Sequence, residues 1–406
     1  MIESTDTRIL VLDDDPFMLR LLSVLLAGLG LTQVTTFTRG SAALAWIDSA
    51  AGAPALILFD LNMPGMDGVE FVRHLVERCY AGSLILVSGE NERMQQTAES
   101  LMRAHLVNIL GRLKKPVTRQ ALAALLDTWV APDKGRPSKA KRAYGADEVR
   151  AAISGGELVV HYQPKVAVSS GRVHGVEALV RWRHPADGMV FPDQFIGVAE
   201  EHGLIGDLTA TVLREALGDT RRWRDAGLAL RVSVNVSMDD LASLDFPRCV
   251  AAQAAAAGVP AEDVVLEVTE SRLAKDLRIP LEVLTRLRLK RFSLSIDDFG
   301  TGHSSLAQLR NFPFDELKVD RSFVHGAHAD DTLRAIYDAS LGLARQLGMD
   351  VVAEGVEDLD DWNLLRRTGC GTAQGYFIAS PMPADEVPRW IDAWEAGFQE
   401  RFGVLA

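Results

Sequence analysis

Hydrophobic runs in the second part of the chain repeatedly end on a polar side chain that could bind a metal ion or a phosphate group. Seven such runs follow residue 155. Their polar ends, in chain order, are Glu177, Asn235, Glu267, Asp297 with Asp298, Lys318, Glu354 and Gln374. One polar residue at the end of an apolar strand carries little information, but seven in succession predict a shared site.

The spacing of these polar ends predicts the fold of this part of the chain. By subtraction of residue numbers they lie 58, 32, 30, 21, 36 and 20 residues apart. A strand, a helix and two short connections take roughly 25 to 40 residues, so most gaps predict one β/α unit. The long gap between Glu177 and Asn235 predicts two units. Repeated β/α units predict a TIM-type (β/α)8 barrel, whose strands end around one mouth.

The first 130 residues show a different alternation of short apolar runs and amphipathic segments. The pattern predicts strands at 8–12, 33–37, 55–59, 83–87 and 107–110, and helices at 17–29, 41–49, 68–78 and 118–130. This order predicts a doubly wound, flavodoxin-like α/β domain. Polar side chains follow these strands too, namely Asp13, Asp14, Asp60, Ser88 and Lys115. We expect them to gather at the carboxyl ends of the strands, where open parallel sheets bind ligands.

Residues 131–145 differ in composition from the segments on both sides. They contain two prolines, two glycines and five Lys or Arg residues, which is typical of an exposed linker. A single β/α barrel takes about 250 residues, so a chain of 406 residues has room for one further domain. The predicted organisation is therefore a front domain at 1–130, a linker at 131–145 and a barrel at 146–406.

Composition and charge exclude several classes of protein. With 48% hydrophobic and 24% charged residues and no apolar run near 18 residues, we expect a globular protein without membrane insertion. The first residues, MIESTDTR, do not resemble a secretory signal. Cys79, Cys249 and Cys370 lack CxxC spacing, so we expect no disulfides, no zinc site and a cytoplasmic location. The net charge of −12 argues against binding DNA or RNA.

The front segment resembles the receiver domain of two-component response regulators. The motifs that carry the resemblance are LVLDDDP, LILFDLNMPGMDGVEF, LVSGE and KKP, within about 120 residues. The resemblance implies that Asp60 is the phosphoacceptor and that Asp13 and Asp14 bind one metal ion beside it. It implies that Ser88 is the switch hydroxyl and that Lys115 contacts the phosphoryl group. A sensor histidine kinase would be the partner.

From residue 146 onward the chain resembles the EAL family of cyclic di-GMP phosphodiesterases. The matching motifs are YQPKV, EALVRW, NVS, EVTES, DDFGTGHSSL, KVDRSF, EGVE and QGYFIASPMP. The resemblance implies hydrolysis of cyclic di-GMP to linear pGpG at two metal ions, in a protein that often forms homo-oligomers. By this resemblance, one metal would be bound by Glu177, Asn235, Glu267 and Asp297. Asp297, Asp298 and Glu354 would bind the second metal, with Asp297 bridging the two.

The same resemblance implies roles for side chains around the metals. Lys318 would orient or deprotonate the attacking water, and with Asp297, Asp298 and Glu354 it would complete the catalytic set. Gln374 would hold the water or metal shell. Gln163 and Arg181 would contact the guanine and the phosphate of the substrate. A further acid, Glu270, would anchor the DDFGTGHSSL loop without touching the substrate.

The chemistry of phosphodiester hydrolysis is consistent with this set. Two cations can stabilise the charge on the attacking and leaving oxygens and lower the pKa of a bound water. Carboxylate and amide oxygens favour Mg²⁺ or Mn²⁺, in the barrel as in the front domain. A lysine that is desolvated close to these metals is expected to have a lowered pKa, so Lys318 could act as a base.

Two positions depart from the patterns of the two families. Arg112 stands three residues before Lys115, where receivers usually carry an aromatic switch residue, and His303 replaces an aromatic residue in the DDFGTGHSSL loop. Two other functions therefore stay open beside a hydrolase controlled at Asp60. The barrel could be a catalytically silent cyclic di-GMP receptor, or the protein could be an adaptor that acts through protein contacts. The complete ligand set and Lys318 favour the enzyme, because a receptor has little need of a water-activating group.

Overall fold

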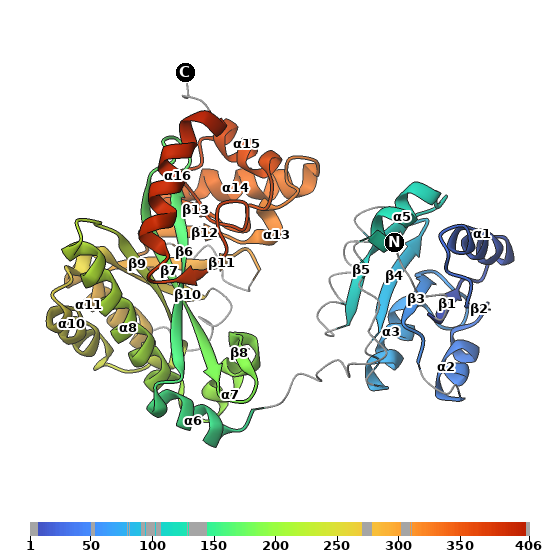
Figure 1. The fold of residues 1–406 in the computed structure, drawn as a ribbon, viewed down its shortest axis with the longest axis horizontal. Helices are drawn as coiled ribbons and strands as arrows, with labels where there is room; N and C mark the ends of the chain where they lie inside the picture. Colours follow the sequence, from blue (N-terminus) through green and yellow to red (C-terminus); the bar gives the residue numbers. More distant parts are fainter. Residues whose placement is uncertain are drawn as a thin grey trace. The chain divides into compact units, whose positions relative to one another are not determined.

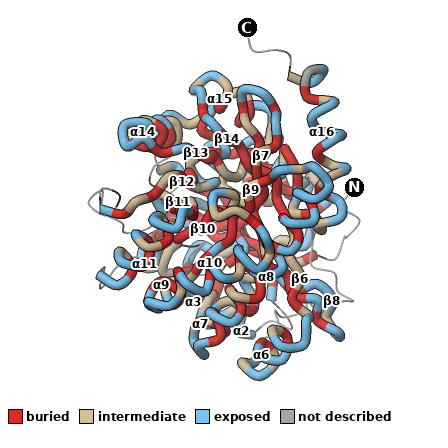
Figure 2. The backbone as a smooth tube through the Cα atoms, turned by 90° about the vertical axis from the view of Figure 1, so that its left-hand side faces the viewer, coloured by how far each residue is buried: buried red, intermediate tan, exposed pale blue. Residues whose placement is uncertain are grey.

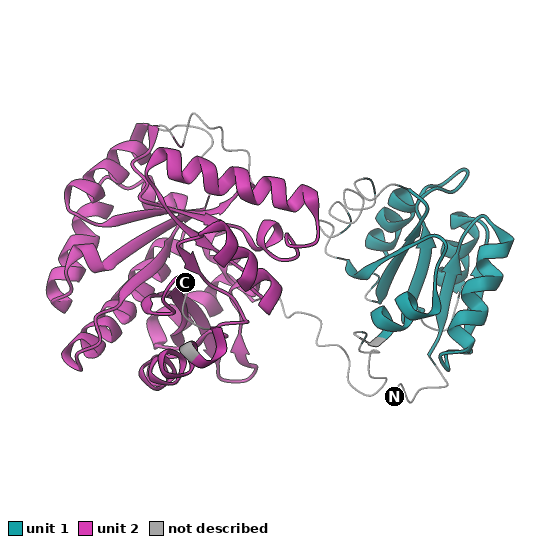
Figure 3. Cartoon of the chain, turned by 90° about the horizontal axis from the view of Figure 1, so that it is seen from above, with its two compact units in different colours: residues 1–140 teal, residues 141–406 magenta. Residues whose placement is uncertain are grey.

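The computed structural model describes most of the chain in two compact units, residues 1–140 and 141–406 (Figure 3). The residues described are 7–49, 53–78, 80, 82–90, 94, 102, 107–127, 129, 144–269, 278–301, 309 and 311–402. The predicted linker lies outside them except for residues 144 and 145, and so do Cys79, Glu270 and His303.

The front unit is a five-stranded parallel sheet between helices (Figure 1). Its strands are β1 (Ile9–Leu12), β2 (Val34–Phe37), β3 (Leu56–Asp60), β4 (Ser83–Ser88) and β5 (Asn108–Lys114). Its described helices are α1 (Pro16–Ala27), α2 (Gly40–Ser49), α3 (Gly68–Glu77) and α5 (Arg119–Asp127). The strand order β2-β1-β3-β4-β5 is the flavodoxin-like order, which confirms the predicted fold class.

Both faces of the front sheet are covered, as the apolar runs of its strands indicate. Ile9 and Val11 of β1 pack in one hydrophobic cluster, while Leu10 and Leu12 pack in another. Successive side chains of a strand point to opposite faces, so a strand buried on both faces is apolar without interruption. The sheet is therefore the middle layer of three.

The second unit is a closed barrel of eight strands surrounded by helices. The eight strands are β6 (Leu158–Ala167), β7 (Val173–His184), β9 (Arg231–Val236), β10 (Val264–Thr269), β11 (Ser293–Phe299), β12 (Glu316–Val319), β13 (Asp350–Ala353) and β14 (Thr372–Ala373). Pairing of β6 with both β7 and β14 closes the barrel. Two short strands, β8 (Gly188–Val190) and β15 (Met382–Pro383), extend the sheet beyond it. The predicted barrel is confirmed.

One strand departs from the all-parallel arrangement of a TIM barrel. β6 runs antiparallel to both of its neighbours, whereas the other seven strands are parallel to one another. The sequence pattern did not reveal this reversal, because alternation of apolar and polar positions has the same period in either strand direction.

The prediction of two β/α units between Glu177 and Asn235 is wrong. β7 pairs directly with β9, so the gap contains no additional barrel strand. Its length comes from the hairpin of β7 with β8, the short helices η1 (Pro192–Gln194) and α7 (Ile196–Glu201), and the long helix α8 (Ile205–Asp225). The prediction compared the gap with the length of an average β/α unit, but α8 alone takes 21 residues.

The remaining helices lie on the outside of the barrel, and the buried positions gather in the strands (Figure 2). The described helices are α6 (Ala146–Gly155), α9 (Met238–Leu241), α10 (Phe246–Ala257), η2 (Ala261–Asp263), α11 (Arg278–Leu289), α13 (Arg321–Val324), α14 (Asp331–Leu347), α15 (Leu359–Thr368) and α16 (Val387–Phe402). Within the described ranges, no helix has both the length and the apolar character needed to cross a membrane.

Candidate functional site

The polar strand ends that the sequence singles out converge at one mouth of the barrel. They lie in β7 (Glu177), β9 (Asn235), β10 (Glu267), β11 (Asp297 and Asp298) and β12 (Lys318), and directly after β13 (Glu354) and β14 (Gln374). The parallel register brings neighbouring ends to one level, for example Asn235 beside Glu267. The reversed strand β6 contributes Gln163, which lies opposite Glu177.

Lys318 lies at the centre of this mouth among four carboxylates. Its Nζ is 2.7 Å from Glu267, 2.7 Å from Glu354, 3.0 Å from Asp297 and 3.5 Å from Glu177. Its side chain is 1% exposed. Burial alone would lower the pKa of the ammonium group, but the four carboxylates raise it well above its ordinary value. Without metal ions the pKa of Lys318 is therefore raised, and the lowering expected close to bound metals stays a prediction.

The carboxylates of the mouth form two groups that share one member. Glu177, Glu267 and Asp297 offer one oxygen each within 4.8 Å of one another, and so do Asp297, Asp298 and Glu354. Each group could hold a metal ion. All of these donors are hard carboxylate oxygens, without sulfur or imidazole, so they fit Mg²⁺ or Mn²⁺ better than Zn²⁺.

Asp298 lies at a sharp change of direction in the backbone. Its φ of 54° is unusual for a residue other than glycine, and the pairing of β11 with β12 shifts register between Ile296 and Phe299. Burial and then the neighbouring Asp297 raise the pKa of Asp298 to about 6. The turn therefore directs a second carboxylate into the mouth, where it is costly to ionise without a cation.

Side-chain amides fix the position of Glu177. Gln374 Nε2 donates to Glu177 Oε2 at 2.6 Å and to Gln163 Oε1 at 3.0 Å, and Asn235 Nδ2 donates to Glu177 Oε1 at 2.8 Å. Gln163 in turn donates to the Ala379 carbonyl oxygen at 3.0 Å. Because the amide nitrogen of Asn235 donates to Glu177, its amide oxygen is the atom that could bind a cation.

Arg181 lies apart from the carboxylates, on the part of β7 that continues past the mouth. Its Nη1 donates to the carbonyl oxygen of Val180 at 2.8 Å. Its guanidinium carbon is 5.2 Å from the ring centroid of Phe191, in a cation–π contact. The side chain is held at the edge of the site, in position to meet a ligand larger than a single phosphate group.

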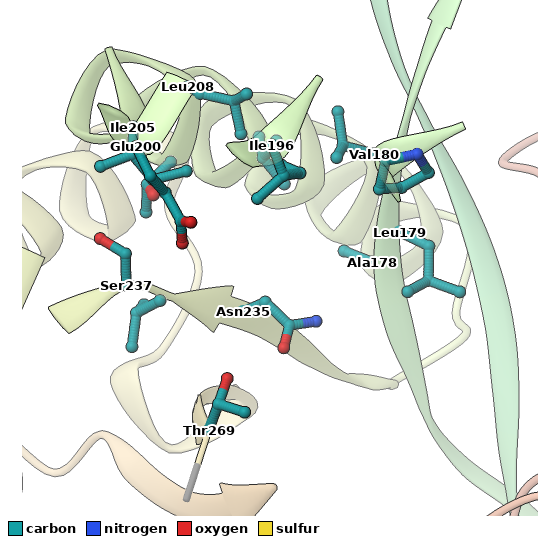
Figure 4. A pocket seen from close by; sticks show the side chains of 14 residues that line it. Ala178, Leu179, Val180, Ile196, Glu200, Ile205, Leu208, Asn235, Ser237 and Thr269 are labelled. Atoms are coloured by element: carbon teal, nitrogen blue, oxygen red, sulfur yellow. The ribbon is translucent and has the colours of Figure 1, made fainter. Parts of the chain in front are cut away.

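Two cavities lie beside residues of the mouth. One, of about 220 Å³, is lined at the mouth by Gln163, Glu177, Glu354, Gln374 and Tyr376, together with Arg321 and Glu357. The other, of about 260 Å³, lies between β7, β9 and α8 (Figure 4). In Figure 4, Asn235, Ser237 and Thr269 lie across this second cavity from Ile196 and Leu208. Polar and apolar walls side by side suit a ligand with a charged centre and a flat, largely apolar end.

The front unit brings its own acidic residues together at the carboxyl ends of its strands. Asp13, Asp14 and Asp60 offer oxygens within 4.8 Å of one another. Lys115 Nζ is 2.7 Å from both Asp13 and Asp60. Burial raises the pKa of Asp13, although the ammonium group of Lys115 opposes this effect. Ser88, which is buried at the end of β4, accepts a hydrogen bond from the backbone N–H of Glu90.

Two neighbouring residues complete the description of the front unit. Asp15 is not in the acidic group, because its side chain caps α1 by accepting from the Phe17 N–H at 2.8 Å. Arg112 lies half-buried in β5, three residues before Lys115. The five side chains expected in the crevice thus lie at the carboxyl ends of the strands, and the arginine lies in the strand that leads to Lys115.

Comparison with known protein families decides the classification. The model of the EAL domain matches residues 146–381, which is more than half of the chain. The chain belongs to the EAL domain family. A second model, that of the response regulator receiver domain, matches residues 9–127 in front of the EAL domain.

Known proteins with similar sequences cover the chain to different extents. Cyclic di-GMP phosphodiesterase RocR of Pseudomonas aeruginosa is 33% identical over 381 residues, which are 93% of this chain and 97% of RocR. An uncharacterized signaling protein of Caulobacter vibrioides is 44% identical over 252 residues. This chain spans 31% of the length of that protein, and the match covers 62% of this chain.

A solved structure supports the assignment of the second unit as an EAL domain. The PaMucR phosphodiesterase in its c-di-GMP complex aligns with a TM-score of 0.57 and 39% identity. The alignment covers 59% of this chain and 98% of that structure.

Sequence reasoning overlooked one charged residue inside the EAL domain. Lys165 of β6 is buried below the mouth, where its Nζ is 2.7 Å from Glu267 and 3.1 Å from Glu316. A signal was present, because a lysine stands in this strand two residues after Gln163 and therefore on the same face. Burial alone would raise the pKa of Glu267, but the ammonium groups of Lys165 and Lys318 lower it to about 2.

Proposed function

We propose that this protein is a metal-dependent phosphodiesterase that hydrolyses cyclic di-GMP to linear pGpG, and that phosphorylation of Asp60 controls the reaction. The observation that carries the proposal is the pair of acidic groups sharing Asp297 next to Lys318. RocR, whose length this chain matches almost completely, is a cyclic di-GMP phosphodiesterase. The similarity of the PaMucR complex adds support for the same ligand.

The proposal includes two Mg²⁺ or Mn²⁺ ions in the EAL domain. Glu177, Asn235, Glu267 and Asp297 would hold one of them, and Asp297, Asp298 and Glu354 the other. When bound, such ions stabilise charge on a phosphodiester and make water more acidic. Three carboxylates around each position match the all-oxygen coordination that these ions prefer.

Residues of the chain itself would position the reactants. Lys318, which is held by four carboxylates, would orient the attacking water and exchange a proton with it. Gln374 and Gln163, which are hydrogen-bonded to each other, would contact the substrate at the mouth. Arg181 would bind at the edge, where its guanidinium group can reach a phosphate or a base. The apolar cavity beside Asn235 would take up a base.

One experiment separates the three candidate functions. Purified protein is incubated with cyclic di-GMP and Mg²⁺, and the nucleotides are separated by chromatography. Formation of pGpG supports the enzyme. Intact cyclic di-GMP that binds in calorimetry would indicate a silent receptor, and absence of binding would indicate an adaptor.

The proposal extends to the receiver domain. Asp13, Asp14 and Asp60 would hold one further divalent cation, and a sensor histidine kinase would donate the phosphoryl group to Asp60. Lys115, which contacts Asp13 and Asp60, would meet the charge of the new phosphoryl group, and Ser88 would hydrogen-bond to it. We also propose a homo-oligomer, which sedimentation of the full chain would test.

Asp60→Asn should remove the response to phosphorylation and spare basal hydrolysis. The amide cannot form an acyl phosphate, whereas the acidic groups of the barrel are unchanged. The measurement compares pGpG formation with and without acetyl phosphate in the variant and the wild type. Asp48→Asn, at an exposed position of the same domain, is the matched control and should keep the response. A variant at Asp60 that still responds would show that the phosphoacceptor lies elsewhere.

Metal binding by the EAL domain should weaken as the pH falls through about 6. The pKa of Asp298 without metal is about 6, so protons compete with cations below that pH and not above it. Titration calorimetry with Mn²⁺ between pH 5 and pH 8 should show an apparent dissociation constant that rises by up to about tenfold per pH unit below 6. Asp298→Asn should bind more weakly at pH 7 and depend less on pH. A flat profile for the wild type would contradict this assignment.

A further inference from the structure

The interior of the barrel is polar one layer below the mouth residues. Small barrels of this kind are ordinarily filled by branched apolar side chains. Here Ser233, Ser295 and Glu316 stand two residues before mouth residues of the same strands, so they face the same interior. Lys165 of β6 completes the layer. All four are buried, with at most 5% exposure.

Lys165 joins this layer to one mouth carboxylate. Its Nζ lies 2.7 Å from Glu267 Oε1, 3.1 Å from Glu316 Oε1 and 2.8 Å from Ser233 Oγ. Three acceptors around an ammonium group match its three N–H donors. A buried cation with all of its donors in use holds its partners in one geometry, because any movement would leave a buried charge unpaired.

These contacts fix the carboxylate group of Glu267. Its two oxygens are held separately, Oε1 by Lys165 from below and Oε2 by Lys318 from the mouth, each at 2.7 Å. Lys318 is shared among four carboxylates. Among the described members of the two acidic groups at the mouth of the barrel, Lys165 contacts only Glu267. The hold of Lys165 on Glu267 is therefore the more specific of the two.

We propose that Lys165 is a positioning residue that fixes the carboxylate of Glu267 and so sets the affinity of the EAL domain for its divalent cation. The inference rests on the proposed function, in which Glu267 is a metal ligand. Lys165 does not touch the substrate, because it lies beneath the ligands and is 2% exposed. Partners that orient metal ligands contribute to affinity by roughly 10- to 100-fold.

A purely structural role is the alternative. Lys165 also compensates the buried charge of Glu316, and its loss would leave that carboxylate without its cation. Such a role predicts lower stability. It predicts no specific change in metal affinity in a variant in which the charge of Glu316 has been removed together with that of Lys165. Metal binding without nucleotide therefore distinguishes the two roles, and stability alone does not.

The experiment measures the dissociation constant for Mn²⁺ by titration calorimetry of the full chain without nucleotide. Lys165→Met should weaken binding by about 10- to 100-fold. The Mn²⁺ concentration for half-maximal pGpG formation should rise by a similar factor, while kcat at saturating Mn²⁺ changes less. Ser233→Ala is the matched control, because it removes a neutral acceptor and keeps both ion pairs, and it should stay within about threefold of the wild type.

The double variant Lys165→Met/Glu316→Gln keeps the test decisive if the single variant does not fold. It removes one buried charge of each sign, so it should recover thermal stability but keep the weakened Mn²⁺ binding. Wild-type affinity in either folded variant would overturn the proposal. Absence of pGpG formation by the wild type would instead count against the proposed function. The ratio of the Mn²⁺ dissociation constants of the variant and the wild type would still report on Lys165.

Discussion

Asp297→Asn is expected to abolish hydrolysis of cyclic di-GMP, with kcat/KM falling by at least about a thousandfold, or about 4 kcal/mol of transition-state stabilisation. Among the described residues, Asp297 is the only one common to the two acidic groups at the mouth of the barrel. Its replacement therefore removes a charged ligand from both groups at once, while the shape of the side chain stays nearly the same. The amide also removes one of the four carboxylates around Lys318.

The measurement for Asp297→Asn is the rate of pGpG formation at saturating Mg²⁺, with cyclic di-GMP varied. Asp385→Asn makes the same chemical change at an exposed position of the barrel unit and should keep the wild-type rate. Circular dichroism should show an unchanged fold for both variants. Wild-type turnover by Asp297→Asn would count heavily against a site built on a shared carboxylate.

Lys318→Met is expected to lose nearly all turnover and to destabilise the protein in the absence of metal ions. Four carboxylates, three of them buried, depend on this ammonium group, and removal of one partner of a buried ion pair costs about 3–5 kcal/mol. Divalent cations supply the missing positive charge. Saturating Mn²⁺ should therefore raise the unfolding temperature of the variant by more than it raises that of the wild type.

Thermal unfolding with and without Mn²⁺ measures this effect, and pGpG formation measures the loss of turnover. Lys290→Met, at an exposed position after α11, removes a lysine without touching the acidic groups and is the matched control. The Mn²⁺-dependent shift of the control should equal that of the wild type. Equal shifts in Lys318→Met and the wild type would mean that the lysine does not balance the charge of the carboxylates.

The sequence predicted the fold class and the members of the mouth because both depend on short-range patterns. An apolar run that ends on Asp297 or Glu354 indicates a strand end whatever its neighbours are. Properties that depend on three-dimensional contacts were predicted less well. The pKa of Lys318 depends on how many carboxylates touch it, and the direction of β6 depends on its pairing partners.

The role of Lys165 also depends on three-dimensional contacts that the sequence does not show. Its charge was visible in YQPKV, but its significance comes from Glu267 and Glu316, which lie 102 and 151 residues further along the chain. The gap between Glu177 and Asn235 was misjudged because spacing does not distinguish a long helix with a hairpin from an additional β/α unit. Glu270 and His303 lie outside the described residues, so their proposed roles stay predictions.

The reversal of β6 determines where the chain first enters the barrel. In an all-parallel barrel the first strand would begin on the side away from the mouth. Here β6 begins at Leu158, paired with Trp182, which lies five residues past Glu177 on the mouth side. α6, the first helix after the linker, therefore leads into the rim around the carboxylates. The first ten-residue helix of the barrel unit therefore joins the barrel on the side of the carboxylates and not on the far side.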